Sequence, residues 1–494
     1  MLFNSITFLI FLIIVFILYW YVLNKNLKSQ NCFILISSYI FYGWWDWRFL
    51  LLIVFTSFCS WLSGLLIQHK RDTDHNTKTD QSRRYCRWIV GTNIVINLII
   101  LGFFKYYNFF VDNFVSAFAE VGINLQVSTL KIILPVGISF YTFQALSYSI
   151  DVYRKQIEPT KDIISFLAFI SFFPQLVAGP IERATHLLPQ FYHPRRFDYI
   201  KAVDGLRQIL WGFFKKVVVA DNCAILVNSI FENQETANGS ALLLGAILFT
   251  FQIYGDFSGY SDIALGTARL FGFDLMRNFN VPYFSRDIAE FWRRWHISLN
   301  TWFRDYIYIP LGGSRGGKYQ TVRNTLIIFI VSGFWHGANW TYIIWGAYHG
   351  LLFLPLILLG QNRKYTGEIS PNCILPSFKE GCQMIITFVI VMIGWIIFRA
   401  TDIQSAIAFL KGICSPSLFS LPNTKDLGIG NFIPFGCFIF IGIMLFIEWM
   451  QRNKTHGLDF NIPSPMIRWM IYVFLIMCIF FLQGVQETFI YFQF

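Results

Sequence analysis

Apolar runs long enough to cross a lipid bilayer recur along the whole chain. A hydrocarbon core of about 30 Å needs roughly 20 helical residues, and the charged residues gather mostly between such runs. The clearest runs are Ile6–Leu23, Phe49–Ile67, Trp88–Phe110, Ile132–Ile150, Ala241–Leu265, Thr341–Leu359, Ile385–Phe398, Phe432–Ile447 and Ile467–Leu482. With shorter and broken runs added, the pattern predicts an all-α polytopic membrane protein with roughly 11–13 membrane helices.

The composition excludes an ordinary soluble protein. Hydrophobic residues make up 55% of the chain and charged residues only 14%, whereas a soluble domain carries about a quarter charged residues. The first run, Ile6–Leu23, has neither a basic segment before it nor a small-residue cleavage site after it. We therefore interpret it as a retained membrane helix rather than a signal peptide.

The net charge of +11 comes from basic clusters between apolar runs. Cytoplasmic loops of membrane proteins are enriched in Lys and Arg, so we expect these clusters in the cytoplasm, the N-terminus outside, and no nucleic-acid partner. The clusters are Lys70, Arg71, Lys78, Arg83, Arg84 and Arg87; Arg195, Arg196, Lys201, Arg207, Lys215 and Lys216; and Arg269, Arg286, Arg293, Arg294, Arg304 and Arg323.

The chain has no long linker, low-complexity tract or obvious repeat, so one membrane domain over residues 1–494 is predicted. The loops His69–Arg87 and Gln361–Lys379 are predicted surface connections. Between Ser171 and Lys215, Pro174 and Gly179-Pro180 interrupt an apolar stretch and exclude an unbroken helix. Irregular backbone at membrane depth survives only inside protein or along a water-filled cavity, which predicts a re-entrant or interfacial segment.

A second unusual segment, Asn278–Arg315, is both aromatic and basic. Phe291, Trp295, Leu299 and Trp302 have helical spacing and would form one face. This pattern predicts an amphipathic helix at the cytoplasmic interface, with arginines that extend toward the headgroups. Such a helix could also form the floor of a cavity.

The first candidate for chemistry is His336, within the polar cluster Ser332–Trp340. An ionisable group inside an apolar span is costly and by default marks a functional site. Gly333, Gly337 and Ala338 leave room beside the imidazole for a substrate or another helix, and a neutral imidazole suits proton transfer in a dry site. A structural histidine bonded to a neighbouring helix is an equally open interpretation.

Two further histidines are candidates, His296 and His349. His296 could instead face lipid headgroups. If the chain from His336 onward were one straight helix, His349 would lie about 20 Å along it on a different face. No His, Cys or carboxylate set has metal-ligand spacing, and the nine cysteines show no Cys-x-x-Cys pair. We predict no catalytic metal and no disulfide framework.

Phosphate-loop and nucleophile-elbow motifs are absent from the sequence. The glycine-rich basic stretch Leu311–Lys318 is interpreted as a flexible cytoplasmic turn or as a contact for a phosphate-bearing donor such as coenzyme A. The stretch Asp256–Asp262 is polar enough to line a cavity.

Several of these motifs resemble those of the membrane-bound O-acyltransferase (MBOAT) family. Trp335–Gly337, Trp345–Gly350 and Trp292–Gly313 carry the resemblance. Phe41–Trp45 and the ending Thr488–Phe494 are similar to the bacterial alginate O-acetylation subfamily. The resemblance covers nearly the whole chain.

The resemblance implies a ring of tilted helices around a tunnel, with an acyl thioester entering from the cytoplasm and an acceptor from the other side. It implies that His336 and His296 are catalytic. The expected substrate-binding or tunnel residues are Trp335, Asn339, Trp340, His349, Asn300, Arg304 and Asp305. The donor would be acetyl-CoA or another acyl thioester, with no tightly bound cofactor. Expected partners are an extracytoplasmic glycan, membrane lipid and an exported esterase-like protein.

Other function classes stay open at this point. The subfamily resemblance also extends to a group that moves D-alanine to teichoic acids. Broken helices with midplane polar residues are equally typical of transporters, so the chain could be a conduit for a lipid-linked glycan. A non-catalytic scaffold is the third class. Loss of acyl transfer in a His336→Ala variant that still folds separates an enzyme from the other two.

Overall fold

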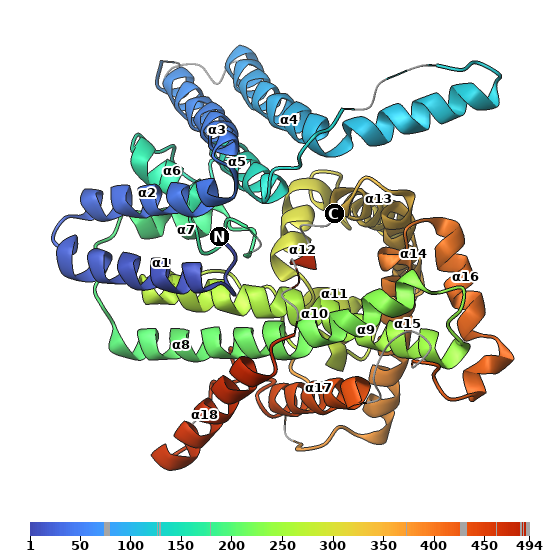
Figure 1. The fold of residues 1–494 in the computed structure, drawn as a ribbon. Helices are drawn as coiled ribbons and strands as arrows, with labels where there is room; N and C mark the ends of the chain where they lie inside the picture. The colour runs from blue at the N-terminus through green and yellow to red at the C-terminus, as the bar shows by residue number, and fades with distance from the viewer. Residues whose placement is uncertain are drawn as a thin grey trace. The chain divides into compact units, whose positions relative to one another are not determined.

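The computed structural model describes residues 1–73, 80–125, 127, 130–177, 179–371, 373–424, 432–460, 462–484, 487, 489 and 490. Within them every regular element is helical (Figure 1). Each of the clearest apolar runs overlaps a helix, which confirms the predicted all-α membrane class. These helices are α1 (Ile6–Ile17) with η1 (Leu18–Val22), α3 (Arg48–Thr73), α4 (Asp80–Glu120), α5 (Ile138–Tyr153), α10 (Gly239–Leu270), α14 (Trp340–Leu358), α15 (Phe378–Arg399), α17 (Phe432–Met450) and α18 (Pro465–Phe481).

Five of the described helices are long and apolar enough to cross a membrane, namely α3, α4, α10, α14 and α15. Four shorter apolar helices begin at Ile6, Ile403, Pro434 and Pro465. The predicted loop His69–Arg87 is shorter than expected because α3 runs to Thr73 and α4 starts at Asp80. Residues 74–79, including Lys78, lie outside the described part.

The helices cluster into two compact units. The single membrane domain over residues 1–494 stays a prediction. Unit 1 comprises Met1–Ala202 and Thr267–Met276, and unit 2 comprises Val203–Gly266 and Arg277–Phe494. The remaining helices are α2 (Leu27–Asp46), α6 (Ile163–Ser171), α7 (Ala184–Leu187), η2 (Leu188–Phe191), α8 (Tyr199–Phe213), η3 (Phe214–Ala220), α9 (Asp221–Glu232), η4 (Pro282–Phe284), α11 (Ile288–Arg294), α12 (Ile297–Phe303), η5 (Arg304–Tyr308), α13 (Gly317–His336), α16 (Ile403–Ile413) and η6 (Pro416–Phe419).

In unit 1, buried polar side chains join α3, α4 and α5. Asn93 of α4 donates to Ser149 of α5 at 2.8 Å, and Ser63 of α3 lies 2.8 Å from the same hydroxyl. Figure 1 shows these helices together. Helices in a membrane gain little from apolar contact with one another, so such interhelical hydrogen bonds help to fix their register.

The interrupted segment after Ser171 is irregular and buried within unit 1. The chain leaves α6 at Phe172, and the next two helices are only four residues long each. Phe172 and Glu182 are fully buried. Glu182 accepts a hydrogen bond from the Met276 backbone and pairs with His186 at 2.7 Å. Protein therefore surrounds the broken backbone, as the sequence predicts.

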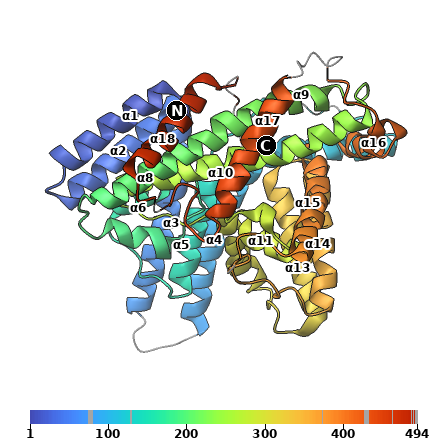
Figure 2. The ribbon, with the colours of Figure 1, turned by 90° about the horizontal axis from the view of Figure 1, so that it is seen from below.

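In unit 2, α13 and α14 form an antiparallel hairpin, and α15 packs on α14 (Figure 2). The hairpin is close because glycines face each other. A Cβ added at Gly333 would lie 2.2 Å from the Tyr342 carbonyl oxygen, and one at Gly346 would lie 2.2 Å from that of Phe329. The small residues beside His336 thus make room for a second helix rather than for a substrate alone.

Candidate active site

His296 occupies a sharp break between two short helices. The sequence predicts one continuous helical face through Trp295, but α11 ends at Arg294, Trp295 is extended, and α12 begins at Ile297. His296 itself has a φ of 45°. A residue with a side chain adopts this left-handed conformation only at a cost of about 1 kcal/mol or more. The surrounding structure must therefore impose it.

Hydrogen bonds on both sides of the break hold this conformation. The Asn300 side chain donates to the carbonyls of Trp292 and Trp295, both at 2.6 Å. The Ile297 backbone donates to the Asn278 carbonyl at 2.9 Å. Asn300, a predicted tunnel residue, thus positions the chain on either side of His296.

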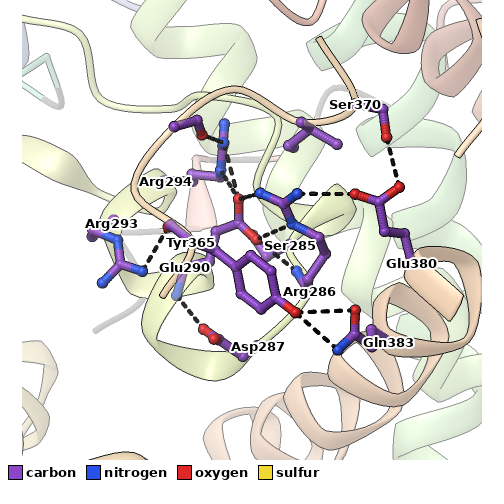
Figure 3. Close-up of polar contacts among 12 residues, drawn as sticks. Ser285, Arg286, Asp287, Glu290, Arg293, Arg294, Tyr365, Ser370, Glu380 and Gln383 are labelled. Carbon is purple, nitrogen blue, oxygen red and sulfur yellow. Dashed lines mark hydrogen bonds and ion pairs between the residues drawn. The ribbon is translucent and has the colours of Figure 1, made fainter. Parts of the chain in front are cut away.

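A buried network of charges anchors α11. Glu290 accepts from Arg286 and Arg294, both at 3.0 Å, and Arg286 also reaches Glu380 of α15 at 3.0 Å (Figure 3). Arg293 donates to backbone carbonyls of the loop after α14. These arginines were expected to extend toward headgroups. Arg294 is instead buried, because Glu290 compensates its charge inside unit 2.

His336 is the last residue of α13, at the turn of the helix hairpin. Gly337 is extended, and Asn339 caps α14 by accepting from the Thr341 backbone at 3.0 Å. Asn339 also donates to the Thr401 carbonyl at 2.8 Å. Because the chain reverses here, the straight-helix condition for His349 does not hold. His336 and His349 each lie 5.1 Å from the Trp345 ring, between centroids.

The three candidate histidines share one aromatic cluster in unit 2. Trp335 lies between His296 and His336, with centroid distances of 6.0 and 4.9 Å. Trp345 lies between His336 and His349. All three imidazoles are buried. The structure thus brings together the histidines that are separated in sequence.

Burial keeps two of these imidazoles in an apolar environment. It lowers the pKa of His296 from 6.5 to about 3, so the ring is neutral at neutral pH. Neither ring nitrogen of His349 has a hydrogen-bond partner among the described residues. Gly394 of α15 is so close that a Cβ there would lie 2.6 Å from His349 Nε2.

A cavity of about 300 Å³ lies against α11, α12, α13 and α14. Its inner wall is apolar and aromatic, and Arg293, Arg304 and Arg363 lie among its lining residues. Other lining residues are Trp292, Ile297, Asn300, Phe329, Ser332, Phe353 and Asn362. Ile297 follows His296, and Ser332 lies one turn before His336, so the cavity lies beside the histidine cluster.

The other predicted residues occupy different places. The Arg304 side chain is 57% exposed and pairs with Asp305 at 2.7 Å. Trp340 is 50% exposed at the start of α14. Asn339 serves as the cap described above. The cavity walls include Asn300 and Arg304 but none of Asp305, Asn339 and Trp340.

The sequence does not predict that the segment after α18 forms part of the site. Phe489 lies 5.8 Å from Phe257, and Phe257 lies 4.7 Å from His296, between ring centroids. The Ile490 backbone donates to Asp256 at 2.7 Å. The sequence does show the carboxylate of Asp256 inside an apolar run, but it does not indicate which residue that carboxylate contacts. Thr488 and residues 491–494 of the predicted ending lie outside the described residues.

Two lysines and their carboxylate partners form, together with the bond from Ile490 to Asp256, a buried anchor for the segment after α18. Lys216 pairs with Asp256 at 2.6 Å and with Asp221 at 2.7 Å, and donates to the Glu487 carbonyl at 3.2 Å. Lys215 pairs with Asp262 at 2.7 Å. The predicted cavity-lining stretch Asp256–Asp262 therefore neutralises buried bases and holds the end of the described chain beside His296.

Helical spans, a buried histidine cluster and a largely apolar cavity with basic residues together describe an integral membrane protein with a buried polar site. Residues 39–366 match the model of the MBOAT, membrane-bound O-acyltransferase family. The chain belongs to this family, and it is a multi-pass membrane protein of the bacterial branch.

Its relatives act on different acceptors. The chain is 43% identical to the probable alginate O-acetylase AlgI of Pseudomonas aeruginosa, over 92% of this chain and 84% of that protein. It is 33% identical to the peptidoglycan O-acetyltransferase of Helicobacter pylori, over 79% and 74%. It is 31% identical to the teichoic acid D-alanyltransferase of Streptococcus thermophilus, over 53% and 68%.

Proposed function

We propose that the chain transfers an acetyl group from a cytoplasmic thioester to hydroxyl groups of an exported polysaccharide. The observation that carries the proposal is the buried His336, placed beside an apolar cavity with basic residues in a member of an O-acyltransferase family. The similarity to alginate O-acetylases covers nearly the whole chain, whereas the similarity to a D-alanyltransferase covers about half. This favours acetyl transfer to a glycan.

His336 is the proposed general base. Its neutral imidazole accepts the proton of the acceptor hydroxyl as the hydroxyl oxygen attacks the thioester carbonyl. The C–S bond then breaks, an ester forms, and the proton passes to the departing thiolate, which leaves as a thiol. A positioned base of this kind contributes about 10²–10⁴-fold to the rate. The aromatic walls exclude water, which would otherwise hydrolyse the thioester.

His296 is the proposed assisting group. Because its pKa is lowered to about 3, it acts as a neutral hydrogen-bonding ring rather than as a cation. Trp335 joins it to His336 within the same cluster. Asn300 is a positioning residue, since its two hydrogen bonds fix the break that presents His296.

The cavity beside α12 and α13 is the proposed donor site. Phe329, Phe353 and Ile297 supply apolar wall for an acyl-pantetheine arm, and Arg293, Arg304 and Arg363 supply charge for its phosphates. Acetyl-CoA and an acetylated carrier protein share this arm. The alternative acceptor is a hydroxyl group of an exported esterase-like partner protein, which then passes the acetyl group on to the glycan.

Acyl transfer by the purified protein in nanodiscs tests the proposal. Acetyl-CoA labelled in the acetyl group, or a carrier protein loaded with the same group, is offered with a glycan acceptor. His336→Ala should remove transfer, whereas the control His69→Ala should keep it, because His69 is an exposed residue of unit 1.

Comparison of His336→Ala with wild type also separates an enzyme from the other function classes. Full transfer by a folded His336→Ala protein would show that His336 is not the base. Glycan export that persists in His336→Ala while wild type transfers no label from either donor would identify a conduit instead of an enzyme.

A further inference from the structure

Unit 1 contains a basic cavity that acyl transfer does not use. Its volume is about 300 Å³. It is formed by the extended segment after η2, by the start of α8 and by the end of α10. The residues that matter are Trp20, Arg195, Arg196, Asp198, Lys201 and Arg269.

The charges lining this cavity are unbalanced. Arg195, Arg196, Lys201 and Arg269 are cationic, and Asp198 is the acidic residue among those that line it. Asp198 is already engaged, since one of its oxygens accepts from the backbone N–H groups of residues 200 and 201 at 2.9 and 3.1 Å. The cavity therefore has a net positive charge that an anion would neutralise.

Three of these cationic groups differ in how far the protein engages them. Arg195 donates to Asn31 at 2.6 Å, to the Gln190 carbonyl at 3.3 Å and to Gln30 at 3.5 Å, and it lies over the Phe273 ring at 4.7 Å. Its buried Nε has no acceptor among the described residues. Arg196 makes no hydrogen bond or ion pair within the described part of the chain, and Lys201 reaches Asp274 only at 3.5 Å. One fixed guanidinium, one unpaired arginine and one weakly paired lysine thus line the same cavity.

In a second basic cavity, in unit 2, two of the arginines are more fully engaged by the protein. They are Arg294 and Arg452. Arg452 donates to the carbonyls of Trp449, Ile369, Ser370 and Cys373. Arg294 is engaged by Glu290. Their donors are committed to the protein, so these arginines serve as structural links rather than as an anion site.

The surroundings of the unit 1 cavity indicate the source of its anion. Exposed apolar side chains alternate with the bases, including Phe197, Tyr199 at 72% exposure and Ile200 at 79%. Trp20 closes one wall and donates to the Leu270 carbonyl at 2.9 Å. Aromatic and aliphatic residues beside Lys and Arg are typical of the level at which lipid headgroups lie.

We propose that this cavity binds the phosphate of an anionic phospholipid headgroup. Arg195 receives the phosphate as a preorganised planar donor, and Arg196 and Lys201 close over it. The exposed apolar residues on the rim contact the acyl chains. The site is independent of the acetyl-transfer proposal and lies entirely in unit 1.

Lipid titration of the full chain in detergent, read by native mass spectrometry, tests the site. Phosphatidylglycerol is compared with phosphatidylcholine for wild type, Arg196→Gln/Lys201→Gln and the matched control Arg84→Gln/Arg87→Gln. The control removes two exposed bases of unit 1 that do not line the cavity. We expect tighter binding of phosphatidylglycerol by wild type, weakened about tenfold or more by the cavity variant and unchanged by the control.

Each other result overturns the proposal. Equal weakening by both variants would mean that net charge alone attracts the lipid. Equal binding of the two lipids would exclude recognition of an anionic headgroup. If wild type bound both lipids equally but retained millimolar inorganic phosphate that the cavity variant lost, the source of the phosphate would be soluble rather than lipid.

Discussion

At the scale of single residues, burial lowers the pKa of His296, which keeps this imidazole neutral at neutral pH. The position of His296 carries two free-energy costs. One comes from its left-handed backbone, and the other from the loss of solvation for its charged form. Neither cost serves the packing of two short helices, which a glycine or asparagine at this break would allow more easily. This combination of strain and burial supports the hypothesis that His296 is a functional residue.

The lowered pKa of His296 predicts a dependence of stability on pH. Between its folded pKa of about 3 and its ordinary value of 6.5, the unfolded chain binds a proton that the folded chain does not. The contribution of His296 to stability is therefore present above pH 6.5 and is lost as the pH falls, by about 1 kcal/mol per pH unit.

Thermal unfolding in nanodiscs above and below the ordinary histidine pKa measures this effect. His296→Asn is the informative variant, because asparagine tolerates the left-handed conformation. Its melting temperature should fall less on acidification than that of wild type. An identical fall in both proteins would assign the acid sensitivity to other groups.

At the scale of elements, close approach of helices fixes the geometry of the site. The glycine pair between α13 and α14 allows the hairpin, and Gly394 of α15 brings a third helix against His349. The three helices lie together in Figure 2. Close backbone approach thus fixes how α13, α14 and α15 pack, and with them the positions of His336 and His349.

Gly394→Ala tests this packing. The added Cβ would lie 2.6 Å from His349 Nε2, so we expect a loss of about 1–3 kcal/mol from overpacking. The double variant Gly394→Ala/His349→Ala removes the clash. Its loss of stability should therefore be smaller than the sum of the losses of the two single variants. Unfolding temperatures of the four proteins give the coupling directly. Strict additivity would show that the two side chains do not meet.

The difference between local patterns and contacts between distant residues explains what the sequence could and could not predict. Helices follow from local apolar runs, so α3 or α10 could be located from their own residues. The break at His296 could not, because Phe291, Trp295, Leu299 and Trp302 keep a helical spacing straight through it. The contact of Ile490 with Asp256 joins residues 234 positions apart, and no local pattern reports such a pairing. His336 and His296 stand out in the sequence as ionisable groups in apolar surroundings, whereas Phe257, which contacts His296, and Phe489, which contacts Phe257, look like ordinary apolar residues.

At the scale of the whole molecule, polar chemistry is divided between the two units. Unit 2 contains the histidine cluster, its cavity and the buried Lys216 anchor, and unit 1 contains the basic cavity. The bilayer makes every buried charge expensive, so each must be compensated by a partner or by a ligand. The buried Lys216 has two carboxylate partners, whereas Arg196, which has none among the described residues, is exposed.

Asp256→Asn tests the anchor. It leaves a buried ammonium with one carboxylate instead of two, and breaking such a pair costs about 3–5 kcal/mol. We expect a lower melting temperature and faster proteolytic release of residues near Glu487. The control Asp274→Asn removes a carboxylate that is 61% exposed and paired only at 3.5 Å, so it should change little. Equal effects of the two variants would argue against the anchor.

The segment anchored by Asp256 and Lys216 leaves the ribosome after every membrane helix of the described chain. The wall that Phe489 contributes beside Phe257 is therefore added last, when the histidines are already in the membrane. A chain interrupted before Glu487 contains the whole reactive cluster but not its final wall. Biosynthesis thus completes the surroundings of His296 only after α18 has been made.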